Sequence, residues 1–198
     1  MAAADFSVTK FKANLKHGGA RPSLFKVEFQ YPSTITTRPN PPDQASFLVK
    51  STTIPASTIG SYDVFYHGKT IHVAGDRTFD TWDTTIINDE DMAARSNIIA
   101  WMRNLAGTLQ GNRDSVFGGS SKVLASSEGD ATVVQMGLDG AAKQSWKVHQ
   151  MWPTELGEIA LDWSSDAIEE YTVAFAYDYW SHGTLTSTTS VISTSISS

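Results

Sequence analysis

The sequence of 198 residues contains no cysteine. Disulfide bonds, thiolate metal sites and a cysteine nucleophile are therefore excluded together. No apolar run comes close to the roughly 18 residues that a membrane-spanning helix needs, and the opening MAAADFSVTKFKANLKHGG lacks the apolar segment of a signal peptide. We therefore expect a soluble protein without a membrane segment, folded in a reducing cytoplasm.

Motifs for catalysis and metal binding are also lacking. The five histidines form no HExxH or HxH pair, and no GxSxG elbow occurs. HGKT (67–70) ends like a phosphate loop, but Asp63 stands where the first glycine is required. Asp80 and Asp83 point to opposite faces if they lie on a strand, which argues against an acid–base pair. The sequence predicts no enzyme, cofactor or metal.

Positive charge is scarce outside the first quarter of the chain. The formal net charge is -6, yet residues 1–50 hold seven Lys/Arg against three Asp/Glu, and residues 51–198 hold eight against eighteen. A general nucleic-acid binder needs a broad basic surface, so this class is disfavoured. Two interpretations stay open: copies of the chain that meet basic end to acidic flank, or an uneven but solvated surface.

Alternating apolar residues are abundant and predict strands. With 40% hydrophobic and 11% aromatic residues, the chain can bury one core, which favours a single domain. In SLFKVEFQY (23–31), Phe25, Val27 and Phe29 are expected to face that core. Further strands are expected at 46–54, in a hairpin over 61–75 that turns at His67 and Gly68, at 77–87, in a hairpin of 131–136 and 143–152, at 155–163, and at 169–180 with alternate aromatics on one face.

One helix is predicted over MAARSNIIAWMRNLAG (92–107), where apolar residues recur at helical spacing. Asp89, Glu90 and Asp91 are expected in its first turn, because carboxylates there complement the positive end of the helix dipole. About eight strands and one helix predict a mainly β fold: a β-sandwich or partial barrel with the helix packed on its side.

Three segments have compositions that do not favour a packed core. The chain is expected to divide into an N-terminal arm (1–19), a β domain (20–183) and a C-terminal tail (184–198) with eleven Ser/Thr among fifteen residues. Within the domain, the Gly/Ser-rich stretch 107–130 is expected to form a surface loop. The arm, the loop and the tail are expected to lack fixed structure before assembly.

Three blocks of the sequence resemble the tail tube protein family of contractile-tailed bacteriophages. The blocks are ARPSLFKVEF (20–29), IHVAGDRTFDTWDTTIINDED (71–91), and MWPTELGEIALDW with AFAYDYW (151–163 and 174–180). They span residues 20 to 180 in the order of the family. The arm, the loop and the tail depart from the family pattern, so the resemblance assigns them no role.

The resemblance implies a structural function. In this family, hexameric rings join their sheets edge to edge into a continuous β-barrel, and the rings stack on a baseplate into a channel for the genome. It implies a tail sheath protein, a baseplate and a terminator as partners, double-stranded DNA that passes through without specific binding, and a virion component assembled in the host cytoplasm. A strand-rich chain with unpaired sheet edges and an acidic balance agrees with these expectations.

Several residues are candidates for positions in such a tube. Strands near 46–54, 61–75 and 143–152 are expected to supply the lumen wall, with Asp63 and Glu155 in the bore and the helix 89–106 outside or at ring junctions. Arg77 is expected to pair with Asp76 or Asp80, in its own subunit or a neighbouring one; a solvated ion pair is the alternative. Trp82 lies on the expected strand 77–87, and Trp152, Trp163 and Trp180, at strand ends, are interpreted as core anchors.

Two other functions stay open. The inner tube of a contractile injection system without a genome, such as a secretion or bacteriocin-like particle, has the same architecture. A carbohydrate-binding β-sandwich is suggested by the six tryptophans, and it predicts a monomer with a surface row of aromatic side chains.

Overall fold

The computed structural model describes residues 7–15, 19–32, 35, 48–106 and 128–183. Within these ranges the chain forms nine strands and two helices, so the expected mainly β fold is confirmed. None of the helices in these ranges is long and apolar enough to cross a membrane. The elements are α1 (Val8–Asn14), β1 (Phe25–Gln30), β2 (Val49–Thr52), β3 (Thr58–Tyr66), β4 (Lys69–Thr78), β5 (Trp82–Ile87), α3 (Ala93–Leu105), β6 (Gly129–Met136), β7 (Ala142–Leu156), β8 (Glu170–Ala176) and β9 (Tyr179–Gly183).

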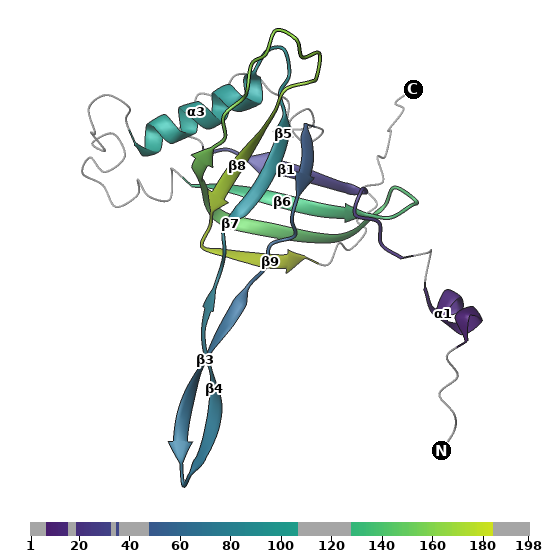
Figure 1. The fold of residues 1–198 in the computed structure, drawn as a ribbon, viewed down its shortest axis with the longest axis vertical. Coiled ribbons are helices and arrows are strands. Elements are labelled where there is room, and N and C mark those ends of the chain that lie inside the picture. Colours follow the sequence, from purple (N-terminus) through teal and green to yellow (C-terminus); the bar gives the residue numbers. More distant parts are fainter. Residues whose placement is uncertain (1–6, 16–18, 33–34, 36–47, 107–127, 184–198) are drawn as a thin grey trace, which may run out of the picture.

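The long strand β7 belongs to two layers of the fold (Figure 1). Its first part pairs with β6 on one side and β9 on the other, and its last residues pair with β8. The full order is β1-β6-β7-β8-β5-β2, with β9 on β7, and β3 and β4 form a separate two-stranded sheet. Gln150 has a φ of 55°, so the change of layer falls at a residue in the left-handed region.

Aromatic side chains from four segments form the centre of the core. The rings of Trp82 and Phe175 lie 5.8 Å apart, those of Trp101 and Phe175 6.2 Å apart, and those of Tyr31 and Trp101 5.9 Å apart. Burial raises the pKa of Tyr31 to about 12. Gly129 is required beside this cluster, because a Cβ there would lie 2.7 Å from the Trp101 ring. The expected inward face of β1 is confirmed, since Val27 is buried and Phe25 and Phe29 pack against the core.

Helix α3 packs on β7 and places Ile98 and Trp101 in the core. It begins at Ala93, and its first turn holds no acidic residue, so the expected position of the three carboxylates is wrong. The residue before the helix, Met92, has a φ of 50°, so the backbone is not helical between the acidic segment and Ala93. Asp89 still accepts a hydrogen bond from the Ala93 N–H at 3.2 Å and so satisfies one of the donors at this end.

Several strand boundaries differ from the expected ones. Strand β7 ends at Leu156, and residues 157–163 form no strand; the expected strand 169–180 is divided between β8 and β9; and β4 and β5 divide the expected strand 77–87. The alternation of side chains is correct in β5, with Trp82, Thr84 and Ile86 on the buried face, and in β8. It is wrong for Tyr179, which was expected on the face of Tyr171 but is 45% exposed on β9. Periodicity identifies a face, but it does not show where a strand changes its partner.

Parts of the expected arm and loop belong to regular secondary structure. Residues 8–14 of the arm form α1, whereas no fixed structure was expected there. Gly129 and Asp130, placed in the surface loop, belong to β6. Residues 107–127 and the tail 184–198 lie outside the described residues.

Asp130 holds the change of layer in β7. It accepts a hydrogen bond from the Gln150 N–H at 3.2 Å, and its carboxylate lies 2.8 Å from Lys147 Nζ. Burial raises the pKa of this carboxyl, but the hydrogen bonds from Lys147 and Gln150 outweigh it and lower the pKa below its ordinary value of 3.8. The carboxylate therefore stabilises the fold above that value, and the contribution is lost as the pH falls through the lower folded pKa.

Replacement of Asp130 by alanine is expected to reduce the free energy of unfolding at neutral pH by about 1–2 kcal/mol, because a backbone N–H and an ammonium group lose their acceptor. Urea denaturation checks this value. The difference from wild type should shrink as the pH falls below 3.8, where the wild-type carboxylate also becomes protonated. Asp166→Ala, at an exposed position, is the control; an equal loss for both variants would contradict the role of Asp130.

Candidate assembly surface

Strands β3 and β4 leave the body of the protein as a two-stranded antiparallel ribbon (Figure 1). Strand β2 leads into β3, β4 leads into β5, and β2 pairs with β5, so the ribbon continues this pair beyond the sheet. At its tip His67 and Gly68 have φ angles of 47° and 76°, as a two-residue hairpin turn with positive φ at both positions requires. The expected hairpin is confirmed, with strands that extend to Thr58 and Thr78.

The two faces of the ribbon differ in polarity. Tyr62 lies opposite Val73, and Val64 lies opposite Ile71, and opposite residues share a face. With Tyr66 these four residues form what we call the apolar face, and Lys69, opposite Tyr66, is its one charged residue, beside the turn. Alternation places Ser61, Asp63, Phe65, Thr70, His72 and Ala74 on the other side, the polar face, where Phe65 is the large apolar exception beside the turn.

The apolar face is exposed to solvent. Tyr62, Val64 and Ile71 are 56%, 44% and 49% exposed, and every residue of β3 is exposed. A two-stranded ribbon alone is marginally stable in water, and apolar side chains gathered on one exposed face indicate an interaction site. Within the ranges described above, no other element of the chain covers this face. A partner molecule is therefore needed to remove it from water.

The polar face carries a hydrogen bond between a histidine and a carboxylate. His72 Nδ1 lies 2.6 Å from Asp63 Oδ1, and both side chains are well exposed. An exposed pair of this kind contributes little to stability, so it does not explain why the ribbon is built. It does keep a carboxylate on the side opposite the apolar face.

Three aromatic side chains hold the segment by which the chain enters the ribbon. Trp82 Nε1 donates to the Thr53 carbonyl at 2.8 Å, Trp180 Nε1 donates to the Ala56 carbonyl at 3.2 Å, and the Tyr177 hydroxyl donates to the same oxygen at 3.3 Å. Trp82 is 1% exposed, so this anchor is rooted in the core. The direction of the ribbon is therefore fixed by the body of the protein.

Strand edges form the second part of the surface. In the described part of the chain, β1 pairs only with β6, β2 only with β5, and β9 only with β7. Each therefore has one edge with backbone N–H and C=O groups that no strand of these ranges pairs. Such edges are templates for pairing with another chain.

Arg77, near the base of the ribbon, was expected to pair with Asp76 or Asp80. Arg77 lies opposite Ile59, Asp76 lies on β4 where the register shifts, and Asp80 lies in the connection to β5. Among the residues that the structure describes, Arg77 forms no ion pair, and so it is not paired with Asp76 or Asp80 of its own subunit. Pairing with a neighbouring subunit stays a prediction.

The two lumen candidates lie on different sheets. Asp63 is on the ribbon, whereas Glu155 is near the end of β7, where it pairs with Ala174 of β8. Both are exposed, as a residue of a bore must be, and their position in a bore stays a prediction.

The interpretation of the late tryptophans as core anchors is correct for two of three. Trp152 and Trp180 are half-buried and pack against the core. Trp163 is 107% exposed, so its assignment to the core is wrong. The reason is that the strand expected at 155–163 ends at Leu156, and the chain beyond it turns away from the sheet. The six tryptophans form no surface row, because Trp82 and Trp101 are buried and only Trp163 is fully exposed.

No catalytic or metal arrangement is found within the described ranges. They contain no group of three or more His, Asp or Glu side chains that could hold a metal ion. A pocket of about 250 Å³ lies between residues 19–24 and the turn from β6 to β7. Its charged groups include Lys143 and Asp139, which bind each other at 2.6 Å and so close the turn. The free strand edges and the exposed ribbon are features for assembly.

Comparisons with known proteins agree with this geometry. Residues 20–183 match the family described as phage tail tube protein. The chain is 36% identical over 163 residues to tail tube protein gp19 of Enterobacteria phage T4, with 81% of this chain and 90% of the relative covered.

Two solved structures share the fold. A chain of the six-fold symmetrised anti-feeding prophage baseplate has a TM-score of 0.55 at 12% identity, and covers 83% of this chain and 95% of its own length. A chain of the sheath–tube complex of an extracellular contractile injection system, PVC, has a TM-score of 0.51 at 13% identity, with 90% and 99% covered.

Proposed function

Because this chain belongs to the phage tail tube protein family, we propose that it builds the tube of a contractile phage tail from stacked hexameric rings that conduct the double-stranded DNA genome. The resemblance of the sequence blocks to that family is thereby confirmed. The observation that carries the proposal is the ribbon, whose apolar face is exposed in the single chain. A structural role of this kind requires no catalytic group.

The open strand edges account for the ring. Copies of the chain pair their edges in a circle, so that the sheets join into one barrel between subunits and no edge is left in solvent. The apolar face of the ribbon lies on a neighbouring copy, and the polar face with Asp63 and His72 turns to the bore. Helix α3 lies outside or at the ring junctions, and Arg77 pairs with a carboxylate of a neighbouring subunit.

The charge of the chain suits the passage of DNA. A duplex carries about one negative charge per 1.7 Å of its axis, so a basic wall would bind it. This chain has a formal net charge of -6, and Asp63 and Glu155 are exposed carboxylates available to the lumen. A lumen of like charge lets the duplex slide without specific binding.

The proposed partners are those of a contractile tail: a sheath, a baseplate and a tail terminator, in a virion assembled in the host cytoplasm. A sheath–tube complex and a six-fold symmetrised baseplate contain chains with the same fold, which supports this placement. The tube of a contractile injection particle without a genome is the second candidate, favoured by these same structures. The 36% identity to a phage T4 protein favours the phage tail.

Electron microscopy of the purified chain tests the assembly. We expect hollow filaments or rings with six-fold symmetry in negative stain, because the ribbon and the edges find their partners on other copies. A particle that stays monomeric at every concentration, with or without baseplate as a template, would contradict the proposal. DNA inside the tail of native particles distinguishes the phage from the injection system.

Asp63→Lys is expected to make the assembled tubes retain DNA, because it places an ammonium group in the bore. Co-sedimentation of short duplex DNA with the tubes at low salt measures this, and the retention should fall steeply as salt is raised. Glu90→Lys makes the same charge change in the exposed connection between β5 and α3 and is the control. Equal retention by both variants would show an effect of net charge alone and remove Asp63 from the bore.

A further inference from the structure

Helix α1 presents an uncovered apolar face. Val8 and Phe11 are 69% and 67% exposed, and their spacing places them on one side of the helix. Leu15, the residue that follows the helix, is 43% exposed. Lys12 lies next to this side, and α1 buries none of its residues. The helix precedes residues 20–183, so it lies outside the part of the chain that the family match covers.

The length of α1 indicates that it needs a partner. It has seven residues, and isolated helices shorter than about 12 residues are marginal in water. Most helical stability in proteins comes from packing of the apolar face. The face of Val8 and Phe11 is therefore expected to be covered when the protein is in its working state.

The connection from β7 to β8 presents a surface of complementary character. We call residues 157–169 the acidic loop. Its apolar residues Leu161, Trp163 and Ile168 are 80%, 107% and 72% exposed. The acidic loop contains four Asp/Glu and no Lys or Arg. An exposed tryptophan among carboxylates suits an apolar segment that also carries positive charge.

The acidic loop is ordered by its own hydrogen bonds. Asp162 Oδ1 accepts from the Ser164 N–H at 2.9 Å and from the Ser164 hydroxyl at 2.8 Å, and these bonds lower the pKa of Asp162. At its base, Arg95 Nη1 donates to the Gly157 carbonyl at 3.1 Å. The loop therefore holds Trp163 in water in a prepared conformation, which lowers the entropy cost of binding.

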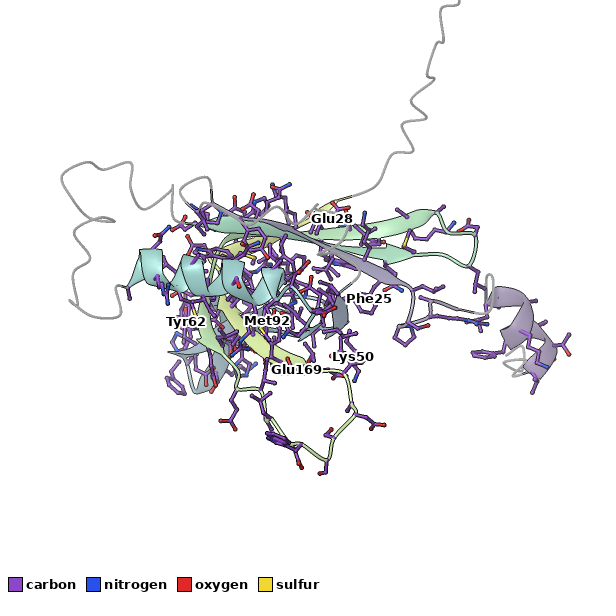
Figure 2. All side chains as sticks on the ribbon, turned by 90° about the horizontal axis from the view of Figure 1, so that it is seen from above. Phe25, Glu28, Lys50, Tyr62, Met92 and Glu169 are labelled. Carbon is purple, nitrogen blue, oxygen red and sulfur yellow. The ribbon has the colours of Figure 1, made fainter. Side chains whose placement is uncertain are left out.

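The two surfaces lie on different sides of the same chain. In Figure 1 α1 lies below and to the right of the sheets, and the acidic loop projects at the top. Figure 2 shows the loop before Glu169 leaving the body at the bottom of the view, with α1, in purple, apart from it at the right. A contact between the two surfaces therefore joins two copies of the chain.

We propose that α1 of one copy docks on the acidic loop of a second copy, with Phe11 against Trp163 and Lys12 near Asp162 and Asp166. Different surfaces meet in this contact, so it is heterologous and repeats into a ring or a filament. It rests on the self-assembly part of the proposed function and adds a site that the ribbon and strand edges do not supply. It also gives a physical role to the basic first quarter and the acidic remainder of the chain.

Cross-linking tests the contact cleanly because the chain has no cysteine of its own. Single variants Phe11→Cys and Trp163→Cys are mixed, assembled and oxidised, so any disulfide between them joins two copies. Ile168→Cys replaces Trp163→Cys in a second mixture, which keeps the tryptophan in place. Ala13→Cys is the matched control, since residue 13 lies on the opposite side of α1. We expect a mixed disulfide dimer when Phe11→Cys is combined with Trp163→Cys or Ile168→Cys, and no such dimer when Ala13→Cys replaces Phe11→Cys.

Charge reversal gives a second measurement. Lys12→Glu should lower the yield of the cross-link several-fold, and Asp166→Lys in the partner should restore it. If microscopy shows tubes but the Phe11→Cys cross-link does not form, the contact between α1 and the acidic loop is overturned and the tube proposal stands. The acidic loop would then be expected to bind a different protein. Equal cross-linking from Phe11→Cys and Ala13→Cys would also overturn it. Absence of both tubes and cross-links would overturn both proposals.

Discussion

Replacement of Val64 and Ile71 by aspartate should abolish tube formation and leave the subunit folded. The two residues face each other on the apolar face of the ribbon and are 44% and 49% exposed in the single chain, so the change removes no core contact. In the tube the same positions are expected to lie against a neighbouring copy. Burial of an unpaired carboxylate costs several kcal/mol of free energy, and each subunit of the variant would bury two of them on assembly.

The comparison with the polar face makes this prediction specific. Ser61→Asp with Thr70→Asp adds the same charge to the same two strands on the side proposed to meet the bore. Microscopy should show tubes for this control and none for the apolar-face variant, while circular dichroism and the urea midpoint stay unchanged for both. Tubes of normal length from the apolar-face variant would show that the ribbon does not join the copies.

The ribbon shows how far local pattern leads toward structure. Alternation in β3 and β4, with His67 and Gly68 between them, is sufficient to predict a hairpin and to place Asp63 on the face opposite Val64. That the hairpin stands away from the body is not contained in this pattern. It follows from which strands pair, because β2 and β5 join in the sheet and carry β3 and β4 beyond its end.

The tryptophans show the same limit at the level of single residues. Trp82 and Trp163 both follow a sequence that alternates, yet one is 1% exposed and the other 107% exposed. The difference is set by β8, which pairs with β5 along the whole strand but pairs with β7 only as far as Leu156. Burial depends on partners distant in the sequence, so composition and periodicity alone do not assign it.

The sequence allows a prediction that the chain assembles with other copies, but not of which residues form the contacts. Unpaired edges follow from a strand-rich chain of this size, and the resemblance of the sequence blocks points to a tube. The hydrogen bonds of Trp82 and Trp180 to carbonyls at the base of the ribbon join residues distant in the sequence, so no local pattern predicts them. The helix α1 has only two turns, so its periodic pattern is short. A search of residues 8–15 for helical spacing would have indicated α1.

Trp101→Ala is expected to lower the free energy of unfolding by about 3–5 kcal/mol, the range for removal of a large aromatic side chain from a core. Trp101 is 1% exposed, and its ring lies 5.9 Å from that of Tyr31 and 6.2 Å from that of Phe175. It also joins α3 to the start of β6, where Gly129 leaves room for it. Since a domain of this kind has about 5–15 kcal/mol in total, the loss is a large part of its stability.

Urea denaturation followed by far-ultraviolet circular dichroism measures the loss of stability in Trp101→Ala, and Trp163→Ala is the matched control. Both variants remove the same side chain, but the control removes one that is 107% exposed and should change the free energy of unfolding by less than about 0.5 kcal/mol. Trp163→Ala should instead weaken the contact of the acidic loop with α1. A control as unstable as Trp101→Ala would place Trp163 in the core and contradict its proposed role between copies.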